Sequence, residues 1–150
     1  MTELSGHGIH IDLPQGWDGR IYRREGGHPV LHAASFRLPE GDGDFGPRAV
    51  AATPGGGVFV AMPQYDPALA GTPLYADQGV PVPIAAEDLN AKAFPRPIPG
   101  LVAVQRFFTE NGRPFCVYLV LGASGGDAAD PLTRANRVLA TIRVEPLGTA

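Results

Sequence analysis

Four histidines offer the first route to chemistry in this chain of 150 residues, because neutral imidazole is the commonest metal ligand in proteins. His7 and His10 lie in a segment that alternates like a strand, so residues three apart point to opposite faces. His28 precedes Pro29 in a loop, and His32 lies in the apolar row of a predicted strand. None of these spacings is one that zinc sites use. We therefore expect no metal site and no cofactor.

The nucleophilic side chains are poorly placed for catalysis. Ser35 lacks the strained turn that exposes a catalytic serine. Cys116 lies in the middle of an apolar run, where a thiol packs as a small hydrophobe. The three glycines at 55–57 are not followed by the Lys-Ser/Thr pair of a phosphate-binding loop. These patterns favour a protein without catalytic activity.

Arg106, His32 and Tyr118 are the candidate ligand- or partner-binding residues. Arg106 is predicted to lie between apolar neighbours in a strand, where a buried cation needs a partner. Two interpretations stay open for it. In the first, the Arg106 stem lies on the apolar face while its guanidinium reaches the sheet margin. In the second, Arg106 forms the cationic floor of a pocket or an interface. His32 has the corresponding alternative of a core histidine with one hydrogen-bond partner.

A β-hairpin must position two of these three residues. Asn111-Gly112 lies between two apolar runs, which is a strong signal for a two-residue turn with positive φ at both positions. The hairpin then joins strands at residues 101–109 and 115–121, with Phe108 opposite Phe115. Both faces of this hairpin are largely apolar, so each needs a cover.

Shorter patterns predict the remaining elements. Asp130 and Pro131 are typical of a helix cap and first turn, and apolar residues follow at three- and four-residue spacing. Further strands are predicted over residues 8–13, 20–24, 30–38, 58–65 and 141–144, and helices over 45–53 and 131–140. Together these elements predict one α+β domain over residues 1–150. Its antiparallel sheet carries the C-terminal helix on one face.

One helix covers only one face of the hairpin, so the other face needs a second cover. The proline-rich segment 66–99 is predicted to be an ordered wrap over that face, because prolines stiffen a chain and lower its ordering cost. The segment 45–53 is a further candidate. A homodimer, with a second copy of the chain as the cover, is the next possibility.

Composition excludes several classes of partner. Apolar residues make up 44% and charged residues 18%, as in globular domains. The net charge is −3 and the sequence has no basic cluster, so a nucleic acid is not an expected partner. No apolar run reaches the roughly 18 residues of a membrane span. The single Cys116 and the lack of a secretory signal predict a cytoplasmic protein.

Two stretches resemble a known family. A strand followed by Leu13-Pro14-Gln15-Gly16-Trp17 and a C-terminal helix running directly into a strand at 136–144 are similar to the PsbP-like α/β sandwich domains. That group includes the Ran-binding nuclear import factor and LpqN-type lipoproteins. The whole chain also resembles small actinobacterial proteins. The resemblance implies a PsbP-like sandwich and a role in binding or assembly, and it transfers no functional residue.

Two functions follow as hypotheses. The first is a non-enzymatic protein-interaction or assembly module with a protein partner. The second is a small-molecule-binding domain or an enzyme, with a pocket near Arg106, His32 and Tyr118. A closed pocket where those side chains converge favours the second, whereas an exposed apolar surface favours the first.

Overall fold

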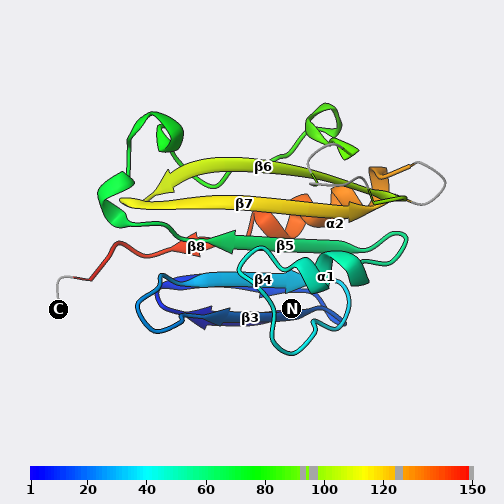
Figure 1. The fold of residues 1–150 in the computed structure, drawn as a ribbon, viewed down its shortest axis with the longest axis horizontal. Coiled ribbons are helices and arrows are strands. Elements are labelled where there is room, and N and C mark those ends of the chain that lie inside the picture. The colour runs from blue at the N-terminus through cyan, green and yellow to red at the C-terminus, as the bar shows by residue number, and fades with distance from the viewer. Residues whose placement is uncertain (92–93, 95–97, 124–126, 149–150) are drawn as a thin grey trace.

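The structure, a computed structural model, describes residues 1–91, 94, 98–123 and 127–148. Two antiparallel sheets form its framework (Figure 1). The large sheet has the order β3 (Asp18–Tyr22), β4 (Val30–Ala34), β5 (Val58–Pro63), β7 (Arg113–Gly122) and β6 (Leu101–Glu110). The small sheet has the order β1 (Thr2–Gly6), β2 (Ile9–Leu13) and β8 (Arg143–Val144). The helices are α1 (Pro47–Ala52), α2 (Ala129–Leu139) and the 3-10 helices η1 (Pro67–Leu69), η2 (Pro73–Tyr75) and η3 (Ala86–Asp88).

The hairpin of β6 and β7 has the predicted register. Phe108 lies opposite Phe115, and the two rings stack with 5.6 Å between their centroids. Asn111 and Gly112 form the turn with φ angles of 49° and 76°. Positive φ at both positions is the geometry that matches the twist of the two strands.

The prediction of a single sheet was wrong. The first residues form β1, which pairs with β2 around a second two-residue turn at His7 and Gly8. Both turn residues have positive φ, 53° and 76°. Most side chains of β1 are exposed, so it lacks the apolar alternation that marks a half-buried strand. Its pairing with β2 gives the protein a second antiparallel sheet.

The back face of the large sheet, the face away from the viewer in Figure 1, is covered by α2 and the small sheet together. The apolar stripe of α2 is buried there as predicted, and β2 and β8 contribute beside it. The helix begins at Ala129 with Ala128 as its N-cap, so the prediction that Asp130 caps it was wrong. The Asp130 carboxylate instead accepts a hydrogen bond from Arg134, one turn along.

The front face of the large sheet is covered by two irregular segments. Residues 35–46 and α1 lie over the β4–β5 side, where Leu38 and Val50 are buried. The predicted wrap is ordered where the structure describes it, and its residues 92–93 and 95–97 lie outside the described residues. It contributes the ring of Tyr75, which packs against Phe107 at 5.7 Å between centroids. The wrap is therefore one of two covers.

The wrap also reaches the opposite face. Ile84 belongs to the back core, where its backbone N–H donates to the Asn136 side chain of α2 at 2.8 Å. The segment thus passes around the outer edge of β6 and contacts both layers. Among the described residues, no helix combines the length and the apolar character needed to cross a membrane.

Candidate functional site

His32 is a fully buried residue of β4 on the front face. Its Nε2 lies 2.9 Å from the backbone oxygen of Asp44, and because a carbonyl only accepts, Nε2 carries the hydrogen. Its Nδ1 has no partner among the described residues. Burial and then the charge of Arg20 lower the pKa of His32 to about 4. The imidazole is therefore neutral at pH 7, as expected of a core histidine with one hydrogen-bond partner.

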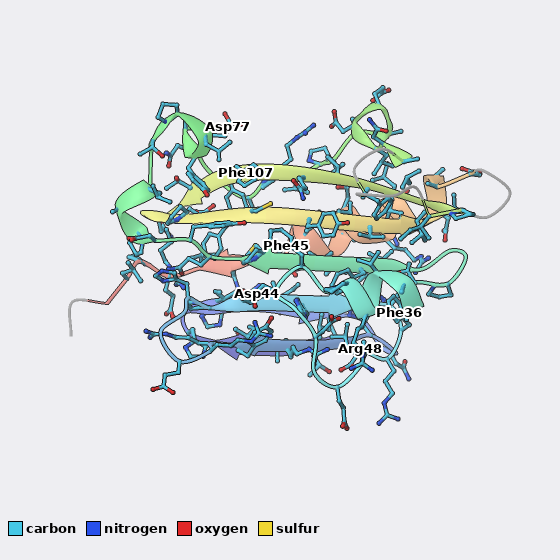
Figure 2. The ribbon with its side chains drawn as sticks, viewed as in Figure 1. Phe36, Asp44, Phe45, Arg48, Asp77 and Phe107 are labelled. Carbon is cyan, nitrogen blue, oxygen red and sulfur yellow. The ribbon has the colours of Figure 1, made fainter. Side chains whose placement is uncertain are left out.

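Tyr118 occupies the same face two strands away. In the paired registers, His32 lies beside Ala61 and Ala61 beside Tyr118, so about 10 Å separates the two backbones. The ring of Phe45 packs edge-on against Tyr118 with 5.8 Å between centroids. Burial raises the pKa of the Tyr118 hydroxyl. Figure 2 shows Phe45 lying over the middle of the sheet.

One loop covers both residues. Asp44 contacts His32 through its backbone oxygen, and the next residue, Phe45, covers Tyr118. The loop is fixed by its carboxylates: Asp44 accepts hydrogen bonds from Tyr22 and Arg24. Because adjacent residues of the loop fill the space above both side chains, His32 and Tyr118 lie under a cover and not around a cavity.

Arg106 lies on the opposite face. It is paired with Val117 and shares the back-face row of its strand with Phe108. Its side chain is 39% exposed, and its guanidinium forms a 2.8 Å ion pair with Asp88 of η3. This is the sheet-margin position that the first interpretation predicted. The three candidate residues therefore do not converge on one pocket.

Cys116 lies beneath an aromatic cluster at the β6 side of the front face. The rings of Tyr65, Tyr75 and Phe107 contact one another with 5.7–6.3 Å between centroids. Burial raises the pKa of the Cys116 thiol to about 12. The thiol is neutral at pH 7 and packs as a small apolar side chain. Among the described residues, no group of three or more His, Cys, Asp or Glu side chains is placed to hold a metal ion.

Arg113 is a buried polar residue that sequence reasoning missed. It is 2% exposed, and its guanidinium donates to the Gln64 side chain at 2.9 Å and to the backbone oxygens of His7 and Glu145 at 2.9 and 3.1 Å. Its cross-strand neighbour Glu110 turns away and accepts the backbone N–H of Val80 at 3.0 Å. Arg113 therefore connects the hairpin to the small sheet.

Three open pockets are lined by described residues. One of about 560 Å³ lies beside His7, Arg113 and Glu145. Another of about 350 Å³ separates the wrap from α2 and β8, and a third of about 340 Å³ lies beside Arg20. None of the three is lined by Arg106, His32 or Tyr118.

Comparisons with known proteins return nothing that resembles this chain. No family model matches it, no curated protein matches its sequence, and no solved structure matches its fold. The resemblance to PsbP-like domains therefore stays a prediction.

Proposed function

We propose that the protein is a non-enzymatic protein-interaction or assembly module. The observation that carries the proposal is a lobe, residues 66–76, that contains η1 and η2 and shows two leucines to solvent. Leu69 is 40% exposed and Leu74 is 59% exposed. The two leucines lie on neighbouring 3-10 helices of one lobe, and exposed apolar area that is contiguous marks surfaces that bind another protein.

The lobe is held in place by a buried threonine. The Thr109 hydroxyl on β6 donates to the backbone oxygen of Tyr75 at 2.7 Å and accepts the N–H of Gly71 at 3.1 Å. The Tyr75 ring then packs into the aromatic cluster beside β6. A partner that binds the two leucines has little ordering entropy left to overcome, because the lobe is already fixed.

The other function, a small-molecule-binding domain or enzyme, has less support. It required Arg106 beside His32 and Tyr118, and Arg106 lies on the other face of the sheet. The two end stretches, at residues 13–17 and 136–144, remain the support for a PsbP-like arrangement. The proposals of a cytoplasmic location, an actinobacterial source and a homodimer as one form of assembly also rest on the sequence alone.

Affinity capture from the cells that make this protein tests the proposal. The bait is the full chain, compared with Leu69→Asp/Leu74→Asp and with Leu147→Asp as the matched control. Leu147 is 49% exposed and lies outside the lobe. We expect wild type and the control to capture the same partners and the lobe variant to lose them. Equal capture by all three, or no enriched partner on wild type, contradicts the proposal.

A further inference from the structure

The outer edge of β6 is only partly covered. β6 is the last strand of the large sheet, so one side of its backbone has no neighbouring strand within the sheet. In the register of the hairpin, every second residue of β6 points its N–H and C=O outward. Leu101, Ala103, Gln105, Phe107 and Thr109 are those residues.

The wrap satisfies the two ends of this edge. At one end, the Thr109 N–H donates to Asp77 and its C=O accepts from Gly79, both at 2.8 Å. At the other end, Ala103 exchanges two hydrogen bonds with Asn90, at 2.9 and 3.1 Å. Figure 1 shows η2 near one end of β6 and η3 near the other. The wrap therefore occupies the position of a neighbouring strand at both ends.

In the part of the chain that the structure describes, the middle of the edge is open. Between those two ends the wrap passes over the back face, where Val80, Ile84 and Leu89 pack on the core. Among the described residues, nothing pairs with the outward backbone groups of Phe107 or with the N–H of Gln105. The Gln105 oxygen accepts a hydrogen bond from the guanidinium of its neighbour Arg106, at 3.3 Å.

We propose that this open edge, residues 104–108, binds a short extended segment of a partner protein by adding it to the sheet as a strand. An unpaired strand edge is a template for main-chain pairing, and an extended peptide supplies the complementary donors and acceptors. This inference rests on the proposed function and adds a second binding surface to the lobe at residues 66–76.

Side chains around the edge define the chemistry of the segment. Gln105 and Phe107 point to the front, beside the aromatic cluster, and Arg106 points to the back, where it is paired with Asp88. A paired strand alternates between the same two faces. A segment with an apolar, a polar and an apolar residue in succession therefore fits, with its polar residue beside the ion pair.

The length of the edge rules out a second copy of β6 as the occupant. From Ala103 to Thr109 is about 20 Å at 3.3 Å per residue, and the wrap occupies both ends. The β6 of a second copy is ten residues long, so it would collide with Gln78 and Asn90 at the two ends of the open edge. The Gln78 and Asn90 of the second copy would collide with the first copy in the same way. A stretch of about five residues fits between them.

Gln105→Pro and Gln105→Ala form a matched pair of variants for the test. Proline removes the outward N–H, which has no internal partner, and an edge strand tolerates it there. Alanine removes only the exposed side chain. The probe is a linear peptide selected on the full-length protein from a displayed library of random heptapeptides. We expect Gln105→Ala to bind it about as tightly as wild type and Gln105→Pro to bind it at least about tenfold more weakly.

Amide hydrogen exchange on the wild-type protein gives a measurement that does not depend on the fold of a variant. The amides of Gln105 and Phe107 should exchange fast in the free protein and slowly with the peptide bound. Those of Ala103 and Thr109 should be protected in both states. Protection of Gln105 and Phe107 in the free protein, a library that yields no binder, or equal affinity of the proline variant overturns the proposal.

Affinity capture separates this proposal from the function on which it rests. If Gln105→Pro captures the same cellular partners as wild type, the edge assignment fails while the interaction function stands. If wild type captures no partner, the interaction function fails, whether or not the selected peptide binds the edge.

Discussion

The two faces of the large sheet are built from different side chains. The back face is mainly aliphatic, with the stacked rings of Phe108 and Phe115 as its aromatic pair. The front face carries Tyr22 and Tyr118, together with His32 and Cys116, and the rings of Tyr65 and Tyr75 pack beside it from outside the strands. The same strands thus present an aliphatic surface to one layer and a mixed surface of small aliphatic, aromatic and polar side chains to the other.

The covers of the two faces differ in the same way. The back is sealed by α2 and the small sheet, elements with regular apolar periodicity. The front is sealed by loops that individual polar groups hold in place: the Asp42 carboxylate accepts the backbone N–H groups of Arg48 and Ala49. The difference teaches that truncation in the larger apolar core of the back face should lower the free energy of unfolding most, whereas the front depends on individual buried side chains and hydrogen bonds.

The largest effect is expected from Phe108→Ala on the back face. Phe108 is fully buried, and truncation removes apolar contacts and leaves a cavity, so the free energy of unfolding should fall by about 3–5 kcal/mol. The matched variant is Phe45→Ala on the front, where the ring is 36% exposed and the loss should be about 1 kcal/mol. Denaturant unfolding measures both. A loss at Phe45 equal to that at Phe108 would break the comparison.

Arg113→Met tests the connection between the hairpin and the small sheet. Methionine keeps the length of the side chain, but it leaves the acceptors on Gln64, His7 and Glu145 without their donor. We expect a loss of about 3 kcal/mol in the free energy of unfolding, measured by denaturant titration. Arg113→Lys, which retains a cationic donor, should lose less. An unchanged midpoint for Arg113→Met would show that the buried guanidinium is dispensable.

Acidification should destabilise the protein through His32 on the front face. The pKa of His32 is lowered from its usual 6.5 to about 4, so between these values the unfolded chain takes up a proton that the folded protein does not. The free energy of unfolding should therefore decrease as the pH falls from 6.5 to 4, by about 2–3 kcal/mol. Unfolding at a series of pH values measures this. His32→Leu should flatten the curve in that window, and an equally steep curve in the variant would assign the effect elsewhere.

Thr109→Val should act mainly on the lobe and less on the protein as a whole. The variant keeps the shape of the side chain and loses the hydrogen bonds to Gly71 and Tyr75, at a cost of about 1–2 kcal/mol. Limited proteolysis should show faster cleavage within residues 66–76. Thr109→Ser retains the hydroxyl and is the control. Cleavage at the wild-type rate in Thr109→Val would mean that other contacts fix the lobe.

Local signals in the sequence predicted much of the fold. The Asn111-Gly112 turn sets the register of the hairpin within a few residues, and the apolar stripe of α2 lies within three turns of helix. The His7-Gly8 turn also has positive φ at both residues, but the residues before it are mostly polar, so β1 was missed. Where turn chemistry and apolar alternation agree, the sequence is sufficient.

The candidate site was less predictable because its contacts join distant parts of the chain. Arg106 finds its partner at Asp88, in a segment whose prolines conceal any periodicity. The buried guanidinium of Arg113 donates to backbone oxygens near both ends of the chain, those of His7 and Glu145. The strand register predicted the face on which Arg106 lies. Its ion-pair partner Asp88 could not be predicted, because the two residues come together only in the folded chain.

The pairing of β2 with β8 has a consequence for synthesis. Ile9 lies beside Val144, so one strand of the small sheet is made long before its partner. At about 5–20 residues per second, the ribosome adds the intervening chain in roughly ten seconds. During that time the edge of β2 stays unpaired and the back of the large sheet lacks α2. The layer behind the large sheet is thus completed late in synthesis. Until then, the apolar surface of β2 is accessible to chaperones.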